Sequence, residues 1–363
     1  MEKIRVWRLP VRAFHWGLVV AVTGAAITGF LLGSPWLTLH LVGGTAALAL
    51  VLARIVWGLT GDGPARFSSF VTGPRAALLH LRGGVRHLGH NPLGGWMVLA
   101  LMAAVLALGL SGAVALGGTL KTGPLAFLAF DTGRTAQELH EVLAIGLLVL
   151  VGLHLAGVGV ESLRSRENLA RSMVTGWKVR RAEDHPLPSA IARPGLALTL
   201  SALVALIAGG LGVALARLPA AGAPVAAGDA LAACADCHMA YPPSLLPAGS
   251  WHDMMTTLSD HFGEDASLPE AERVAVEAYL VAHSAETADT KPAHLFRRMA
   301  QDAPGRISAT PAWRRIHDDL PDTLFDARPI GSRANCAACH QDAATGWFTP
   351  TRIRIPAIEG ETR

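Results

Sequence analysis

Long apolar runs fill the first 217 residues, whereas residues 225–363 are polar in the manner of a soluble domain. A helix needs roughly 20 predominantly apolar residues to cross a bilayer. Five segments meet this requirement, and we expect membrane helices at about 14–32, 37–59, 93–116, 139–160 and 195–216. Buried helices of a large soluble protein are the alternative, but a soluble core does not need five such runs.

Composition supports a chain in parts. Charged residues make up 16% of the chain and the mean hydropathy is +0.36, against about 25% charged residues in a typical soluble protein. We expect an all-α fold: a membrane domain at 1–180, a linker with a fifth membrane helix at 181–224, and a small helical domain at 225–363. The net charge of +3 is too small to indicate nucleic-acid binding. The apolar runs make the lipid bilayer the first expected partner.

The distribution of basic residues predicts the orientation. Lysines and arginines gather in residues 1–12, in the connection between the second and third spans, and in residues 161–181, whereas the other two connections carry few. The positive-inside rule therefore places the N-terminus in the cytoplasm and everything after about residue 218 in the periplasm of a bacterial inner membrane. We interpret the first span as a retained signal anchor, because no small-residue cleavage site follows it.

Four histidines lie in or at the ends of the predicted spans: His15, His40, His140 and His154. Ionisable side chains in a membrane are functional candidates. His140 and His154 are 14 residues apart, about 21 Å along a helix, and they face nearly the same way. We expect His40 and His140 to clamp one non-covalent haem b at the periplasmic side. His15 and His154 would clamp a second at the cytoplasmic side.

Alternatives to haem ligation exist for each of these residues. A lone histidine would more often be interfacial or bridge two helices through hydrogen bonds, but matched depths on three helices favour haem. Gly43, Gly44 and Gly152 would let a porphyrin approach the backbone near these histidines. We expect three further histidines to be surface residues of a basic loop, namely His80, His87 and His90.

Residues 1–178 resemble the bacterial cytochrome b561 family, which is related to the b-type subunits of nickel-iron hydrogenases. The resemblance rests on the segments Val6–Trp16, His40–Gly43, Arg54–Gly58, Gly89–Gly94, Leu139–Glu141 and Met173–Lys178. It implies a four-helix core with two b haems and supports the pairing of histidines above. It also implies electron exchange with membrane quinone, and the fifth span is an addition to that core.

All four cysteines fall in two copies of C-x-x-C-H, the attachment motif of c-type haem. The copies are Cys234-Ala-Asp-Cys237-His238 and Cys336-Ala-Ala-Cys339-His340. In this motif the thiols bond the haem vinyl groups and the histidine binds the iron. A Cys₄ zinc site is the alternative, but the two pairs are far beyond the usual zinc-ribbon spacing of roughly 15–20 residues. We therefore expect two covalent c haems.

The second iron ligand of each c haem is not determined by spacing. The candidates are His252, His261, His283, His294, His317, Met239, Met254, Met255 and Met299. Residues 228–358 resemble the dihaem cytochrome c family, through Ala240–Pro247, Ser250-Trp251, His261–Gly263, Tyr279-Leu280, Arg306-Ile307 and His317, besides the two motifs. That family implies ligation by two histidines, which points to His261 and His317. Chain proximity favours His261 for the first haem, the crossed arrangement stays open, and His252 is in reserve.

Three functions follow from this set of sites. The first is a respiratory electron conduit from membrane quinol through two b and two c haems to a soluble periplasmic cytochrome c-type partner, or in reverse. The second is an enzyme that oxidises superoxide or reduces a small oxidant at an open haem iron. The third is a membrane anchor subunit of a larger oxidoreductase. Ligation of every iron by two histidines leaves no position for a substrate, so catalysis at a haem requires one open iron. Quinol or quinone oxidoreductase activity is the other form of catalysis that this set of sites allows.

Overall fold

The computed structural model describes residues 2–81, 86–182, 184, 186–297 and 305–357. The chain forms two compact units. Unit 1 comprises residues 1–113 and 135–215, and unit 2 comprises residues 114–134 and 216–363. The hairpin between the third and fourth long helices therefore clusters with the C-terminal half. The predicted domain boundaries at 180 and 224 stay a prediction.

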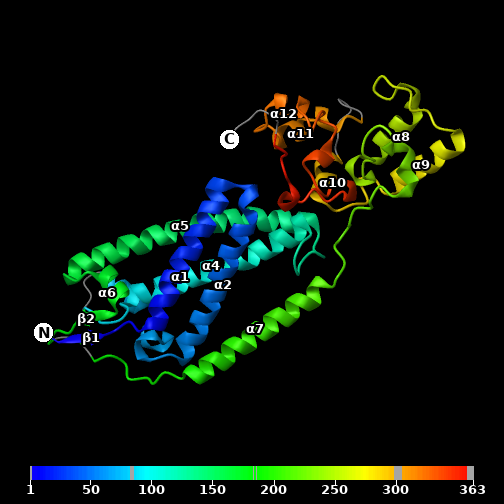
Figure 1. Ribbon diagram of the computed structural model, residues 1–363. Coiled ribbons are helices and arrows are strands. Elements are labelled where there is room, and N and C mark those ends of the chain that lie inside the picture. The colour runs from blue at the N-terminus through cyan, green and yellow to red at the C-terminus, as the bar shows by residue number, and fades with distance from the viewer. Residues whose placement is uncertain (1, 82–85, 183, 185, 298–304, 358–363) are drawn as a thin grey trace. The chain divides into compact units, whose positions relative to one another are not determined.

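Five helices are long and apolar enough to cross a membrane, as predicted (Figure 1). They are α1 (Leu9–Ile27, continued by a π-helical turn at Thr28–Leu32), α2 (Leu37–Thr60), α4 (Pro92–Leu120), α5 (Phe130–Ser165) and α7 (Pro194–Ala216). The helix α5 begins nine residues before the expected span, because Asp131, Arg134 and Glu138 in its first turns do not interrupt helical structure. The predicted all-α fold is confirmed.

Small residues let the helices of unit 1 approach closely. The buried core consists of Ala21, Ala47, Val51, Met102, Val105 and Leu147. A Cβ added at Gly43 would lie 3.2 Å from the carbonyl oxygen of Ala21. Gly43 therefore serves the contact between α1 and α2, which differs from its expected role beside a porphyrin. The sites of Gly44 and Gly152 have no atom within 4 Å of an added Cβ.

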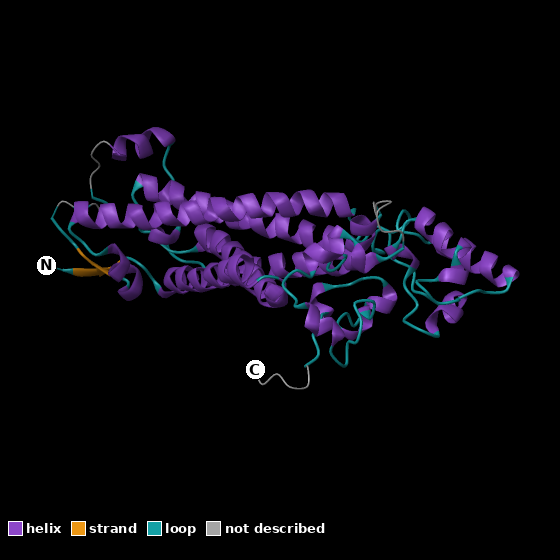
Figure 2. Ribbon diagram, turned by 90° about the horizontal axis from the view of Figure 1, so that it is seen from above, coloured by secondary structure: helices purple, strands orange, loops and turns teal. Residues whose placement is uncertain are grey.

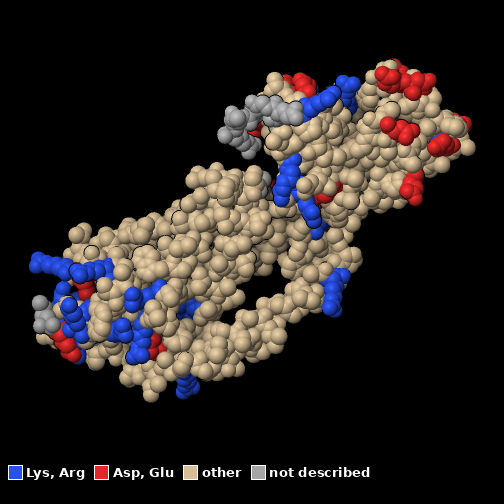
Figure 3. All heavy atoms as spheres, in the orientation of Figure 1, with Lys and Arg blue, Asp and Glu red and all other residues tan. Residues whose placement is uncertain are grey.

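One end of unit 1 carries the short elements. Strands β1 (Lys3–Arg5) and β2 (Trp177–Val179) pair antiparallel with Ile4 opposite Lys178, and β2 contacts α6 (Leu169–Thr175). The short helix α3 (Pro74–Leu81) lies in the connection between α2 and α4. Arg86 bonds Asp184 and lies 3.1 Å from Glu167. Figure 3 shows the lysines and arginines of unit 1 gathered at this end. The strands were not predicted, because three residues are too few for a periodic pattern.

Unit 2 contains short helices joined by loops (Figure 2). They are α8 (Ala248–Thr256), α9 (Glu270–Ala282), α10 (Lys291–Phe296), α11 (Pro311–Ile316) and α12 (Asp322–Asp326). Among the described residues its core contains two large apolar clusters and a small third one of Ala285, Ala288 and Ala293. The first includes Leu231, Leu246, Trp251, Met255, Val276 and Leu280, and the second includes Leu245, Phe296, Trp313, Leu324, Phe325 and Ile330.

Asp289 holds the hairpin of unit 2 to α10, and we call this group of contacts the Asp289 clamp. One carboxylate oxygen accepts hydrogen bonds from Lys121 Nζ at 2.7 Å and from the backbone N–H of Phe130 at 2.8 Å. The other oxygen lies 2.8 Å from His294 Nε2, and the His294 ring stacks on Phe130 with centroids 4.2 Å apart. The Lys121 side chain is 1% exposed and the Asp289 side chain 26%, so the clamp is a partly buried ion pair.

Candidate functional site

The four histidines of unit 1 form two pairs. His40 on α2 and His140 on α5 have ring centroids 6.1 Å apart, and His15 on α1 and His154 on α5 have centroids 6.5 Å apart. With a metal–nitrogen bond of about 2 Å and roughly 1 Å from nitrogen to ring centroid, two imidazoles on opposite sides of one iron have centroids about 6 Å apart. Both pairs therefore fit around an iron.

Backbone carbonyls orient the His40/His140 pair. His40 Nδ1 lies 2.9 Å from the carbonyl oxygen of Ala25, and His140 Nδ1 lies 3.1 Å from that of Leu108. Because a carbonyl only accepts hydrogen bonds, each Nδ1 carries the proton and each Nε2 presents its lone pair. A hydrogen bond of this kind is the usual support of a metal-bound imidazole.

The surroundings of these two rings repeat one pattern. Four residues after each accepting carbonyl stands a glycine, where an added Cβ would lie 3.2 Å from His40 Cε1 (Gly29) or 3.1 Å from His140 Cε1 (Gly112). The residue before each glycine has a hydroxyl near Nδ1, at 3.4 Å for Thr28 and 3.1 Å for Ser111. Sequence reasoning missed these supports, although a hydroxyl residue followed by glycine inside an apolar helix was a detectable signal.

In unit 2 each C-x-x-C-H motif packs against its own apolar cluster, Cys234 against the first and Cys339 against the second. His238 and His261 have ring centroids 6.1 Å apart, and His317 and His340 have centroids 6.2 Å apart. The structure thus brings each motif histidine to one of the two expected distal histidines. His317 Nδ1 lies 2.9 Å from the Trp313 carbonyl and His238 Nδ1 lies 2.7 Å from the Met239 carbonyl, as in unit 1.

Three of the four cysteines are half-buried, and Cys237 is exposed. Burial raises the pKa of the Cys336 thiol to about 11 and also raises the pKa values of Cys234 and Cys339. Within the described residues no group of three or more His, Cys, Asp or Glu side chains could hold a metal ion by itself.

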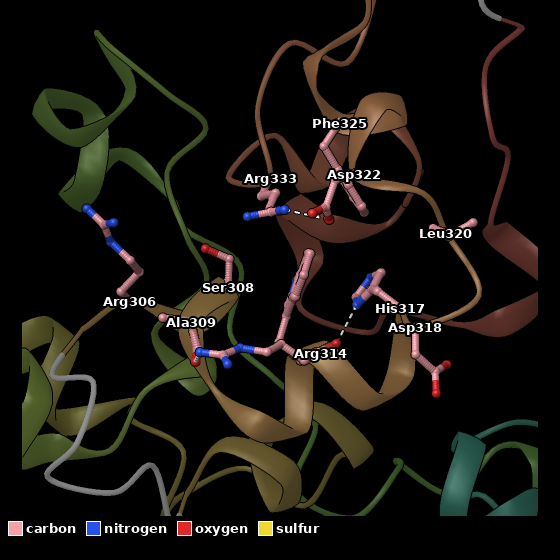
Figure 4. A pocket seen from close by; sticks show the side chains of 11 residues that line it. Arg306, Ser308, Ala309, Arg314, His317, Asp318, Leu320, Asp322, Phe325 and Arg333 are labelled. Carbon is pink, nitrogen blue, oxygen red and sulfur yellow. Dashed lines mark hydrogen bonds and ion pairs between the residues drawn. The ribbon is translucent and has the colours of Figure 1, made fainter.

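A cavity of about 540 Å³ lies beside His317 in unit 2 (Figure 4). Trp313 and Phe325 supply aromatic surface, and three arginines line it as well, namely Arg306, Arg314 and Arg333. Arg333 pairs with Asp322 at 2.6 Å. A porphyrin combines a flat apolar ring with two carboxylates, and guanidinium groups bind carboxylates well. The lining therefore fits a haem.

The other distal candidates make contacts of their own. His252 bonds Glu277 at 2.6 Å, His283 Nδ1 lies 2.9 Å from the Tyr279 carbonyl, and His294 belongs to the Asp289 clamp. Met255 is buried in the first apolar cluster, with Met254 packed against it. Met239 is partly buried beside His238, and Met299 lies outside the described residues.

The surface expectation was wrong for two histidines of the basic loop. His80 is 6% exposed, with Nε2 3.6 Å from Glu161. His90 lies between Trp7 and Phe70, at centroid distances of 4.8 and 4.4 Å, and burial lowers its pKa to about 3. The connection folds onto the bundle through aromatic contacts, which the loop's polarity did not reveal. His87 is exposed, as expected.

Two family models match separate parts of this chain. The model described as prokaryotic cytochrome b561 matches residues 6–176, and the model described as dihaem cytochrome c matches residues 230–348. The chain joins a cytochrome b561 to a dihaem cytochrome c. As members of these families do, it binds haem b in its membrane part and two haem c groups in its C-terminal part. It is a multi-pass membrane protein that transfers electrons through these haems to a redox partner.

Curated relatives match the membrane half. A probable Ni/Fe-hydrogenase B-type cytochrome subunit of Azotobacter chroococcum is 24% identical over 227 residues, covering 51% of this chain and 94% of the relative. The subunit of the same name in Azotobacter vinelandii is 25% identical over 228 residues, with the same coverage of both chains.

Solved structures match the C-terminal half. A diheme cytochrome c from Rhodobacter sphaeroides is 43% identical and covers 32% of this chain and 92% of its own, with a TM-score of 0.28. A diheme cytochrome c from Shewanella baltica is 32% identical and covers 36% and 94%, with a TM-score of 0.30.

Proposed function

We propose that this cytochrome carries electrons across the bacterial inner membrane between the quinone pool and a soluble periplasmic cytochrome c-type partner. The carrying observation is the set of four histidine pairs, two in each unit, with ring centroids 6.1 to 6.5 Å apart. Ligation of each iron from both sides leaves no coordination position for a substrate. Such haems serve electron transfer, with reduction potentials set by ligand identity, hydrogen bonding and burial.

The ligand assignment is part of this proposal. His40 with His140 and His15 with His154 would each hold one haem b. Cys234 and Cys237 would bond one haem c, held by His238 and His261, and Cys336 and Cys339 would bond the other, held by His340 and His317. The aligned Nδ1 bonds to carbonyls support Nε2 as the iron-binding atom in His40, His140, His238 and His317.

The orientation rests on charge. The basic end of unit 1, with β1, β2 and α6, would face the cytoplasm by the positive-inside rule. His15 lies seven residues into α1 from that end, which would make the His15/His154 haem the cytoplasmic one. The His40/His140 haem would then be on the periplasmic side, where unit 2 would meet its soluble partner.

Electron transfer as a subunit of a larger oxidoreductase is a second candidate, favoured by the similarity to hydrogenase B-type cytochrome subunits. Native mass measurement after purification in mild detergent separates the two. A single chain that reduces a soluble cytochrome c supports the conduit, and a stable large co-purifying oxidoreductase supports the subunit.

The decisive experiment is a pyridine haemochrome spectrum of the purified chain with a haem-stained denaturing gel. We expect two b and two c haems per chain, with stain retained on the polypeptide. His154→Ala should remove one b haem. His261→Ala should open a c haem to carbon monoxide, whereas the control His252→Ala should not. Carbon monoxide binding to the unaltered reduced protein would contradict the relay and favour an enzyme with an open iron.

A further inference from the structure

A cavity of about 430 Å³ lies between α1, α2 and the start of α7, within unit 1. Its walls are mostly apolar, with Phe14 from α1, Leu50 from α2, and Ala197 and Leu198 from α7. Its volume falls within the range of roughly 300–1,000 Å³ typical of small-molecule sites. All three helices are candidate membrane spans, so a ligand for this cavity would come from the bilayer.

Backbone hydrogen bonds fix the third wall. Arg193 N donates to Thr60 O at 2.8 Å, and Gly63 N donates to Ala190 O at 3.0 Å. A Cβ added at Gly63 would lie 1.8 Å from the Pro188 carbonyl oxygen, so only glycine allows this close contact. The matched cytochrome b561 region ends at residue 176. The wall formed by α7 is therefore specific to the extended chain.

Two residues that line the cavity have buried donor atoms without hydrogen-bond partners, although the Arg54 guanidinium also lies over the rings of Phe14 and Phe67, at 5.9 and 5.0 Å from their centroids. Arg54 is 3% exposed, and its Nη1 has no hydrogen-bond partner in the described part of the chain; the same holds for Trp57 Nε1. The guanidinium and the indole N–H only donate, and leaving such groups unpaired in an apolar environment is costly. A ligand that satisfies both donors in this apolar cavity would bring acceptor oxygens on an apolar body.

We propose that this cavity binds the ring of a membrane quinone, whose carbonyl oxygens accept hydrogen bonds from Arg54 and Trp57. This inference rests on the proposed quinone-linked function and locates its membrane substrate. Phe14 directly precedes His15 in the sequence, so the ring would lie next to the His15/His154 site. The haem that His15 and His154 would hold could accept the two electrons of a bound quinol one at a time, its ferric iron becoming ferrous and passing the first electron to the next haem before taking the second, while the two quinol protons would pass to water.

Stopped-flow reduction tests this proposal with the haem-loaded full chain in detergent. Decylubiquinol is the probe, the b-haem α-band is the readout, and dithionite gives the total reducible haem. We expect Arg54→Gln and Ala197→Phe to slow the reduction of the b haems by quinol at least tenfold. Haem content and the reduction of the haems by dithionite should be unchanged. Leu206→Phe is the matched control, because Leu206 lies on the same helix, does not line the cavity and is 73% exposed.

The remaining outcomes separate the site from the function. If quinol reduces the b haems of both cavity variants at the unaltered rate, the proposed site is wrong, although the protein still oxidises quinol. Loss of b haem in Arg54→Gln, with Ala197→Phe reduced normally, would assign Arg54 to a haem propionate and also overturn the site. If dithionite reduces the unaltered protein and quinol does not, the proposed quinone-linked function itself fails, and the site fails with it.

Discussion

Replacing Asp289 with asparagine should destabilise unit 2 by about 2–3 kcal/mol. The substitution leaves the buried ammonium of Lys121 without its counter-charge. The new amide NH₂ must also face either the two donors Lys121 Nζ and Phe130 N or the His294 ring. Removing one partner of a buried ion pair costs about 3–5 kcal/mol. The Asp289 side chain is 26% exposed, so water offsets part of that cost and reduces the expected loss to about 2–3 kcal/mol.

Thermal unfolding of the haem-loaded full chain, followed by Soret circular dichroism, measures this effect. For a unit of this size 1 kcal/mol corresponds to about 2–4 °C, so we expect the unfolding midpoint to fall by roughly 5–10 °C. Asp326→Asn, an exposed residue of α12, is the matched control and should leave the midpoint unchanged. Adding Lys121→Met to Asp289→Asn should recover part of the loss. A fall smaller than about 2 °C would refute the reasoning that the clamp is a partly buried ion pair.

Three further predictions concern the same features. Gly112→Ile should displace the His140 ring, because even a Cβ there would lie 3.1 Å from it; haemochrome analysis should show loss of one b haem, while Gly209→Ile on α7, where a Cβ meets nothing within 4 Å, should keep both. Ser111→Ala removes a polar neighbour of His140 Nδ1 and should raise the midpoint potential of that haem in a redox titration, since weaker hydrogen bonding lowers the basicity of the ligand; an unchanged potential would contradict this. Burial alone would raise the pKa of Asp289, but hydrogen bonds from Lys121 and His294 bring it below its usual value. Between the folded and unfolded pKa values of Asp289 the unfolded state therefore binds more protons. The contribution of Asp289 to stability is complete above about pH 4 and is lost as the pH falls through the lower folded pKa. Asp289→Asn should accordingly flatten the acid limb of the stability curve, and an identical acid limb in both proteins would count against the clamp.

Patterns that depend on short sequence distances were predictable. The apolar runs predicted five helices, and the C-x-x-C-H repeats predicted covalent haem, because each signal lies within a few residues or one helix. The burial of His80 and His90 was missed because it depends on how a polar loop folds back onto Trp7, Phe70 and Glu161. The pairing of β1 with β2 was equally invisible, since it joins segments about 170 residues apart.

The supports around the haem-facing histidines form a middle case. Ser111-Gly112 stands in the apolar helix α4 and Thr28-Gly29 in the π-helical turn that continues α1, and nothing in their local sequence pattern says which histidine they face. The contact appears only when α1 packs on α2 and α4 packs on α5. The Asp289 clamp is similar, because Lys121 and Asp289 are 168 residues apart. A lysine beside an apolar helix gives no sign of a partner so distant in the chain.

The membership of residues 114–134 in unit 2 bears on how the C-terminal part could be produced on its own. A secreted fragment beginning at residue 225 would keep both attachment motifs, yet it would leave Asp289 facing water instead of Lys121 and the Phe130 backbone. The connection between the membrane part and the C-terminal part is therefore not confined to the linker before residue 225. A fragment or chimera meant to keep the Asp289 clamp would have to include residues 114–134 as well.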